Sequence, residues 1–117
     1  MEISEWQSQV DLWIKEYGVR YFNVMTNTLL LNEEVGEFSR LVARAYGEQS
    51  FKEEMPKQEI KKNLADEMSD IIFVVTCLAN QLDIDLTKAL NKNLQKKTKR
   101  DSTRHTQNPK LSEDVFK

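Results

Sequence analysis

Two pairs of acidic residues have a spacing that suits metal binding. Glu34 and Glu37 are three residues apart, and so are Glu67 and Asp70. On a helix, side chains three residues apart leave the same face. Each pair lies in a segment otherwise rich in apolar residues, so two helices packed side by side would bring all four carboxylates together.

Four converging carboxylates need positive charge between them. In a partly buried site, like charges repel and raise one another's pKa, and a divalent cation removes that cost. The ligands would all be oxygen atoms, because neither His nor Cys belongs to the motif. This donor set points to Mg²⁺ or Mn²⁺, and less to Ca²⁺ in an intracellular enzyme.

A solvated acidic helix face is the alternative interpretation, and carboxylates on such faces normally have Lys or Arg about four residues away. The first pair has Arg40 and Arg44 nearby. The basic residues nearest to the second pair are Lys62 and Lys88, which lie too far along the chain. Spacing alone therefore leaves metal binding and a solvated face both open.

Four helices are predicted to position these residues, over 4–17, 24–46, 57–82 and 86–100, because apolar residues recur at helical spacing in each. The later part of the third is apolar almost all round, which is typical of a helix central in a bundle or at an interface. Three Gly and two Pro in 117 residues leave few tight turns, so an all-β fold is excluded and an all-α fold is expected. The expected boundary residues are Ser4 and Asp85 as N-caps, Pro56 in a first turn, and Gly18 and Gly47 as helix stops.

Length and composition set further limits. The chain suits one domain, and we expect it to span residues 1–100, followed by a polar tail over 101–117. No stretch of about 18 apolar residues exists, and the acidic N-terminus does not resemble a secretory signal. The single cysteine, Cys77, excludes an internal disulfide and a Cys-rich zinc site, so a reducing, cytoplasmic location is expected.

Charge is distributed unevenly along the chain. Residues 1–87 contain 8 Lys/Arg and 16 Asp/Glu, whereas residues 88–117 contain 9 Lys/Arg and 3 Asp/Glu. In the fourth helix, basic residues recur every four positions and form a stripe that could clamp phosphate groups or remain a solvated face. Nucleic acid is disfavoured as a partner, because the acidic body would repel it and no aromatic residues interleave with the basic ones. The stripe consists of Lys88, Lys92, Lys96 and Arg100.

The acidic pairs and their flanks resemble the E-E-x-x-E…E-x-x-D signature of the MazG-like all-α nucleotide pyrophosphohydrolases. The similarity covers roughly residues 20–100. Two features depart from the family pattern: 29 residues separate Glu37 from Glu67, and the fourth helix ends Lys99-Arg100-Asp101. The matching segments are Glu33-Glu34-Val35-Gly36-Glu37 within 31–38, Glu67-Met68-Ser69-Asp70 within 64–72, and the fourth-helix start at 83–92.

The resemblance implies a four-helix bundle completed by homodimerisation, with some members pairing again into tetramers. It implies hydrolysis of a nucleoside triphosphate, including non-canonical or surplus dNTPs, to the monophosphate and pyrophosphate. Glu34, Glu37, Glu67 and Asp70 would hold Mg²⁺, with Mn²⁺ as a substitute, and Glu33 or Glu34 would orient or deprotonate the attacking water. The phosphates would meet Lys92, Lys96 and Arg100, from the same or a partner subunit.

Two hypotheses of another class remain at this point. In the first, the chain is a non-catalytic helical interaction or regulatory module, and the acidic residues hold a structural divalent cation. This hypothesis predicts no nucleotide turnover with any divalent metal. In the second, residues 88–104 bind nucleic acid, which predicts a salt-sensitive affinity that is lost when Lys92 and Lys96 are reversed in charge.

Overall fold

The computed structural model describes residues 1–112, and all the regular elements in that range are helical. The all-α expectation is therefore confirmed. The four α-helices are α1 (Ile3–Trp13), α2 (Val24–Tyr46), α3 (Lys57–Gln81) and α4 (Leu86–Asp101). A π-helical turn (Ile14–Gly18) continues α1, and a short 3₁₀ turn (Pro109–Leu111) follows α4.

Helix boundaries follow the local sequence closely. Asn23 caps α2 through its side chain, which accepts from the Thr26 backbone N–H at 2.8 Å. Asp85 caps α4 as expected, accepting from the Lys88 N–H at 3.2 Å. Gly47 ends α2 at a place where an added Cβ would lie 2.6 Å from a backbone carbonyl oxygen, so only glycine fits.

Three boundary expectations were wrong. Glu2 rather than Ser4 occupies the N-cap of α1, and its side chain makes no capping hydrogen bond. Pro56 occupies the N-cap of α3, one residue before the first turn in which we expected it. Gly18 is the last residue of the π-helical turn rather than the residue after the helix, and the positive φ, 69°, falls at Val19. A β-branched residue rarely adopts this conformation, which explains why the sequence did not indicate it.

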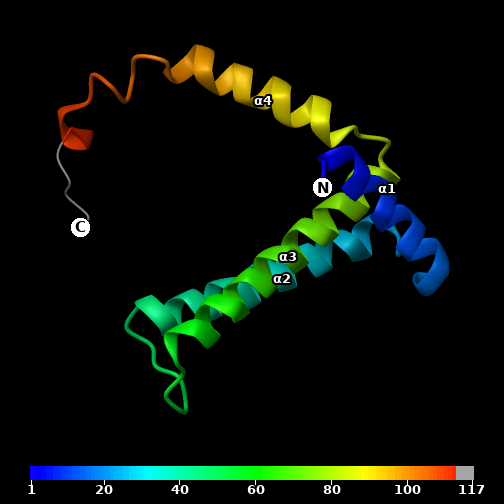
Figure 1. Cartoon of the computed structure of the whole chain (residues 1–117), viewed down its shortest axis with the longest axis horizontal. Helices are drawn as coiled ribbons and strands as arrows, with labels where there is room; N and C mark the ends of the chain where they lie inside the picture. The colour runs from blue at the N-terminus through cyan, green and yellow to red at the C-terminus, as the bar shows by residue number, and fades with distance from the viewer. Residues whose placement is uncertain (113–117) are drawn as a thin grey trace.

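Helices α2 and α3 run antiparallel and side by side over most of their length, and α1 packs beside the C-terminal part of α3 (Figure 1). The core lies between α1 and α3, where the buried side chains of Val10, Ile14 and Cys77 meet. Trp6 and Phe73 cover this cluster in an edge-to-face arrangement, with ring centroids 6.4 Å apart. This packing holds α3, and with it the second acidic pair, against the rest of the molecule.

Helix α4 leaves the α3–α4 turn and extends away from the α2–α3 pair (Figure 1). Among the described residues, its packing is against α1 near its N-terminal end. Two of its leucines, Leu90 and Leu94, are 51% and 64% exposed. A single protomer therefore supplies the four helices of a bundle but does not close the bundle.

Candidate functional site

The α2–α3 pair brings together carboxylates from both halves of the acidic motif. Single carboxylate oxygens of Glu34, Glu67 and Asp70 all lie within 4.8 Å of one another. Glu34 comes from the middle of α2, and the other two come from one face of α3. Residues far apart in the sequence meet because α2 and α3 pack side by side, which is the arrangement that the convergence of the acidic pairs required.

Two oxygen atoms of this cluster are buried without a protein partner. Among the described residues, neither Glu34 Oε2 nor Glu67 Oε2 accepts a hydrogen bond. A buried polar atom left without a partner is costly, and a native structure rarely keeps one for no reason. These two atoms are free to bind a ligand from outside the chain.

The electrostatics of the cluster also favour a cation. Burial is the main cause that raises the pKa of Glu34, Glu67 and Asp70, and the neighbouring carboxylates raise it further. Glu37 contributes to all three shifts. Because the site disfavours the charged form of its own carboxylates, a bound cation would lower its electrostatic free energy strongly.

The donor set fits a hard divalent cation. The three side chains of the group are all carboxylates, and Mg²⁺, Mn²⁺ and Ca²⁺ bind proteins mainly through carboxylate and other oxygen atoms. Two of these ligands bring the buried oxygens that lack partners. The cluster could therefore hold a divalent cation.

The remaining predicted acidic residues lie at the edge of the cluster. Glu37 is exposed, and its carboxylate is outside the group whose oxygens lie within 4.8 Å. It lines a cavity of about 280 Å³ together with Glu67. Glu33 is exposed and does not belong to the three-residue group.

The basic residues predicted to meet phosphates are all on α4, away from the acidic cluster of their own protomer (Figure 1). Lys92, Lys96 and Arg100 are exposed. Arg100 donates from Nε and Nη2 to the carboxylate of Asp101, at 2.8 to 3.1 Å. The basic and acidic residues can therefore meet only if α4 approaches the cluster of another copy or if α4 moves.

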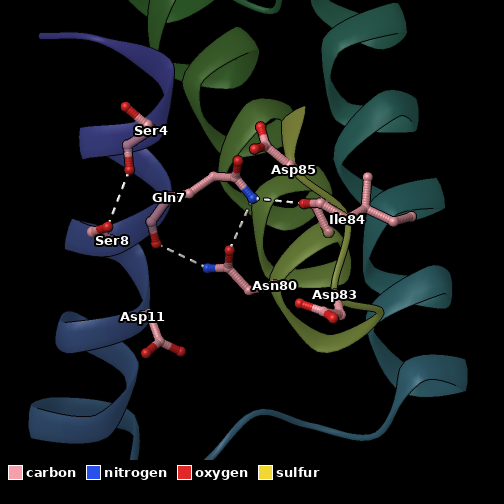
Figure 2. A pocket seen from close by; sticks show the side chains of 9 residues that line it. Ser4, Gln7, Ser8, Asp11, Asn80, Asp83, Ile84 and Asp85 are labelled. Atoms are coloured by element: carbon pink, nitrogen blue, oxygen red, sulfur yellow. Dashed lines mark hydrogen bonds between the residues drawn. The ribbon is translucent and has the colours of Figure 1, made fainter. Parts of the chain in front are cut away.

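A polar cavity of about 430 Å³ lies at a different place, between α1 and the α3–α4 turn. Figure 2 shows Gln7 and Asn80 among its lining residues, hydrogen-bonded to each other, with Gln7 also hydrogen-bonded to the α3–α4 turn at Ile84. Gln7 Nε2 donates to Asn80 Oδ1 at 3.1 Å and to the Ile84 carbonyl at 2.9 Å, and Gln7 Oε1 accepts from the Leu86 N–H at 2.8 Å. These hydrogen bonds fix the α3–α4 turn and so set the direction of α4. The cavity lies about 14 Å from Asp70 along the axis of α3, so it is separate from the acidic cluster.

Sequence reasoning missed the cavity beside the cluster. We considered Arg40 and Arg44 only as counter-ions, whereas both line this cavity with Phe51 and Asn63. The available signal was the helical spacing of Glu37, Arg40 and Arg44, which puts all three on one side of α2. The contribution of Phe51 could not be read from the sequence, because it comes from the connection between α2 and α3.

Comparisons with known proteins identify the family of this chain. A model of the MazG nucleotide pyrophosphohydrolase domain matches residues 22–105, which include the four motif carboxylates and α4. The chain is 37% identical over 102 residues to the uncharacterized protein YpjD of Bacillus subtilis (strain 168), covering 86% of each chain.

Solved structures give the same result. The crystal structure of YpjD from Bacillus subtilis superposes with a TM-score of 0.72 at 33% identity, covering 82% of this chain and 94% of that one. The Bacillus-conserved MazG protein, described as a nucleotide pyrophosphohydrolase, superposes with a TM-score of 0.68 at 31% identity, covering 82% and 88%. The resemblance found in the sequence is confirmed: this chain belongs to the MazG nucleotide pyrophosphohydrolase family, hydrolases that act on acid anhydrides.

Proposed function

We infer that this protein hydrolyses nucleoside triphosphates between the α and β phosphates, with Mg²⁺, and releases the monophosphate and pyrophosphate. Non-canonical or surplus dNTPs in the cytoplasm are the substrates we expect. One observation carries the proposal: two helices bring together three carboxylates, two of which keep a buried oxygen without a protein partner. Family membership supports the same reaction.

In this proposal Glu34, Glu37, Glu67 and Asp70 hold Mg²⁺, with Mn²⁺ as a substitute. The bound ion neutralises the triphosphate and lowers the pKa of a bound water. Glu37 lies at the edge of the cluster and already acts on the pKa of the other three residues. We therefore assign it to the side of the site where substrate and ion meet.

Glu33 or Glu34 accepts the proton of the attacking water. The water oxygen forms a bond to the α phosphorus, the bond from that phosphorus to the bridging oxygen breaks, and pyrophosphate leaves with the electron pair. Glu34 is half-buried within the cluster, where the ion would bind, which favours it as the proton acceptor. Glu33 is exposed beside it and would orient the water.

A homodimer is the expected assembly, because the protomer exposes too much surface for a monomer of its size. Its accessible area is 9990 Å², whereas a compact monomer of 13.7 kDa exposes roughly 6,600 Å². Its radius of gyration is 18.3 Å, against about 13 Å for a compact chain of this length. The excess area, roughly 3,400 Å² per protomer, leaves ample surface for an obligate homodimer interface, which buries about 2,000–5,000 Å² in total over both partners. A second pairing into tetramers would use the same kind of surface.

Helix α4 suits a position between two protomers. Leu86, Leu90 and Leu94 form a leucine stripe on α4, and each lies two residues before a member of the basic stripe. Residues two positions apart on a helix point about 200° apart, so the two stripes lie on opposite faces of α4. The leucines can pack on one protomer while Lys92, Lys96 and Arg100 face the acidic cluster of the other and bind the phosphates there. The charge difference between residues 1–87 and 88–117 favours this arrangement. The enzymatic domain would then be residues 1–100, with 101–117 as an appended tail.

The experiment is pyrophosphate release from a panel of canonical and modified NTPs and dNTPs, with Mg²⁺, Mn²⁺ or EDTA in parallel. We expect metal-dependent pyrophosphate release, and a loss of at least about 100-fold for Asp70→Asn and Glu37→Gln with unchanged helical content. Glu59→Gln, an exposed change in the first turn of α3, is the matched control and should keep full activity. Orthophosphate release would contradict cleavage between the α and β phosphates. Absence of turnover with every nucleotide and metal would favour a non-catalytic module.

A further inference from the structure

The cavity beside the acidic cluster has a volume of about 280 Å³, at the small end of the range for ligand pockets. It opens next to Glu37 and Glu67, so any substrate whose phosphates lie at the cluster has this cavity within reach. The cavity then continues along α2 and α3 toward the connection between them. What fills it bears on substrate choice, and this inference rests on the proposed function.

Arg44 lies at the far end of the cavity. It is ten residues beyond Glu34 on α2, which places its backbone about 15 Å further along the helix axis. Arg44 is half-buried, and among the described residues no carboxylate or carbonyl accepts a hydrogen bond from its guanidinium. Its fork of N–H donors is therefore available to a ligand.

The other walls at this end suit a flat, uncharged ring. Phe51 is half-buried in the α2–α3 connection and offers an aromatic face for stacking. Asn63 is half-buried on α3, and among residues 1–112 its amide donates only to the sulfur of Met55, at 3.5 Å, which is a weak partner. An aromatic face, a guanidinium and an amide together form a surface that recognises a nucleobase by stacking and hydrogen bonding.

A further phosphate is the competing occupant of this end. Three carboxylates (Glu37, Asp66 and Glu67) line the same cavity against the two arginines, so its side chains carry no net positive charge. An anion bound there without a metal ion would be repelled as much as attracted. A base carries no charge and avoids this repulsion.

We propose that this cavity binds the nucleobase of the substrate, and that Arg44 selects 6-oxopurines over adenine. Guanine presents O6 and N7 as adjacent acceptors, and hypoxanthine shares them. Adenine replaces O6 with an amino donor, which faces the donors of the guanidinium unfavourably. A bidentate pair of this kind discriminates by about tenfold or more.

The test compares GTP, ITP and ATP as substrates of the full chain, with kcat and KM measured from pyrophosphate release. We expect a preference of about tenfold for GTP and ITP, carried mainly by KM. Arg44→Ala should abolish the preference. Arg44→Lys should also abolish it, because lysine keeps the charge but not the fork. Phe51→Ala should raise KM for all three nucleotides, whereas Lys61→Ala, an exposed charge removal on α3 outside the cavity, should change nothing.

Calorimetric binding of GMP and AMP separates this inference from the proposed reaction. Tighter binding of GMP that depends on Arg44 would support the nucleobase site even if no nucleotide were hydrolysed. Equal use of GTP and ATP by the wild-type protein would overturn the inference while leaving the reaction intact. A loss in Arg44→Ala and Arg44→Lys that is the same for all nucleotides and for inorganic tripolyphosphate would also overturn it, since the arginine would then contact phosphate. Circular dichroism checks that each variant is folded.

Discussion

At the scale of single residues, the acidic cluster opposes folding while it prepares a site for a cation. Glu67 is the clearest case, because one of its oxygens is buried without a partner and burial raises its pKa. A residue that costs stability and still occupies the centre of a helix pair is retained for function. The cost should be visible in the free energy of unfolding, and it should depend on pH.

We therefore predict that Glu67→Gln stabilises the metal-free protein at pH 8. The ordinary glutamate pKa is 4.5, and the folded-state pKa of Glu67 lies above this value. At pH values between these two pKa values, the folded state therefore binds more protons than the unfolded state. The stability associated with the protonated group is fully present below pH 4.5 and is lost as pH rises through the folded-state pKa. Glutamine resembles the protonated form at every pH. Its advantage should thus grow with rising pH.

Melting temperatures of both proteins in EDTA, from pH 4 to pH 8, measure this effect. The difference between variant and wild type should be close to zero at pH 4 and should reach a few degrees at pH 8. Mg²⁺ should reverse the order at pH 8, because it stabilises only the intact cluster. Glu59→Gln, exposed on the same helix, should show neither effect. If Glu67→Gln is less stable than wild type in EDTA at pH 8, the buried Glu67 carboxylate does not destabilise the metal-free protein, and the prediction is wrong.

At the scale of elements, the direction of α4 depends on α1. Gln7 connects three parts of the chain: it donates to Asn80 at the end of α3, donates to Ile84 in the turn, and accepts from the first residue of α4. Asp83, with φ at 55°, allows the chain to turn there. Helix α4 therefore starts in a direction set by a side chain nearly eighty residues away in the sequence.

Gln7→Ala should loosen this connection. It removes three hydrogen bonds and leaves the Leu86 N–H without its partner, at a cost of about 1–3 kcal/mol. We expect a lower melting temperature and faster hydrogen exchange at the first turn of α4, with the exchange of α2 amides unchanged. Gln9→Ala, an exposed change two residues away on α1, serves as the control. Equal effects of the two substitutions would mean that Gln7 does not direct α4.

At the scale of the whole molecule, the open shape and the exposed apolar residues belong together. Besides the leucines of α4, Leu29, Met68 and Ile72 on the α2–α3 pair are 61%, 48% and 56% exposed. Burying apolar surface contributes about 25 cal/mol per Å², so a contact between copies has ample driving force. Within the described residues, no helix is long and apolar enough to cross a bilayer.

Leu90→Asp should shift the protein from dimer toward monomer. The charge enters the middle of the leucine stripe on α4, where a second copy would bury it at a high cost. Light scattering coupled to size exclusion, over a range of protein concentrations, measures the mass. Gln58→Asp adds the same charge at an exposed position in the first turn of α3, outside α4, and should leave the dimer intact. A wild-type protein that elutes as a monomer at all concentrations would contradict the assembly that we propose.

Local spacing along the chain was enough to predict the helices and to identify the acidic motif. Periodicity located α2 at its observed bounds and α3 within one residue, because long amphipathic segments carry many repeated signals. The spacing of the two acidic pairs predicted that Glu34, Glu37, Glu67 and Asp70 would converge. The packing of α2 against α3 brings Glu34, Glu67 and Asp70 together, whereas Glu37 lies outside this group. These features depend on local spacing, which a sequence contains in full.

The path of α4 and the surroundings of the acidic cluster could be found only in the folded chain. The path of α4 depends on Gln7, Asn80 and a turn at Asp83, which are far apart in the sequence and carry no periodic signal. The cavity with Arg44 and Phe51 arises because a connection without regular structure folds back against two helices. Such features result from contacts between distant residues, and local spacing contains no information about those contacts. For this reason the sequence indicated the chemistry of the site, whereas the structure was needed to find the cavity that we propose selects its substrate.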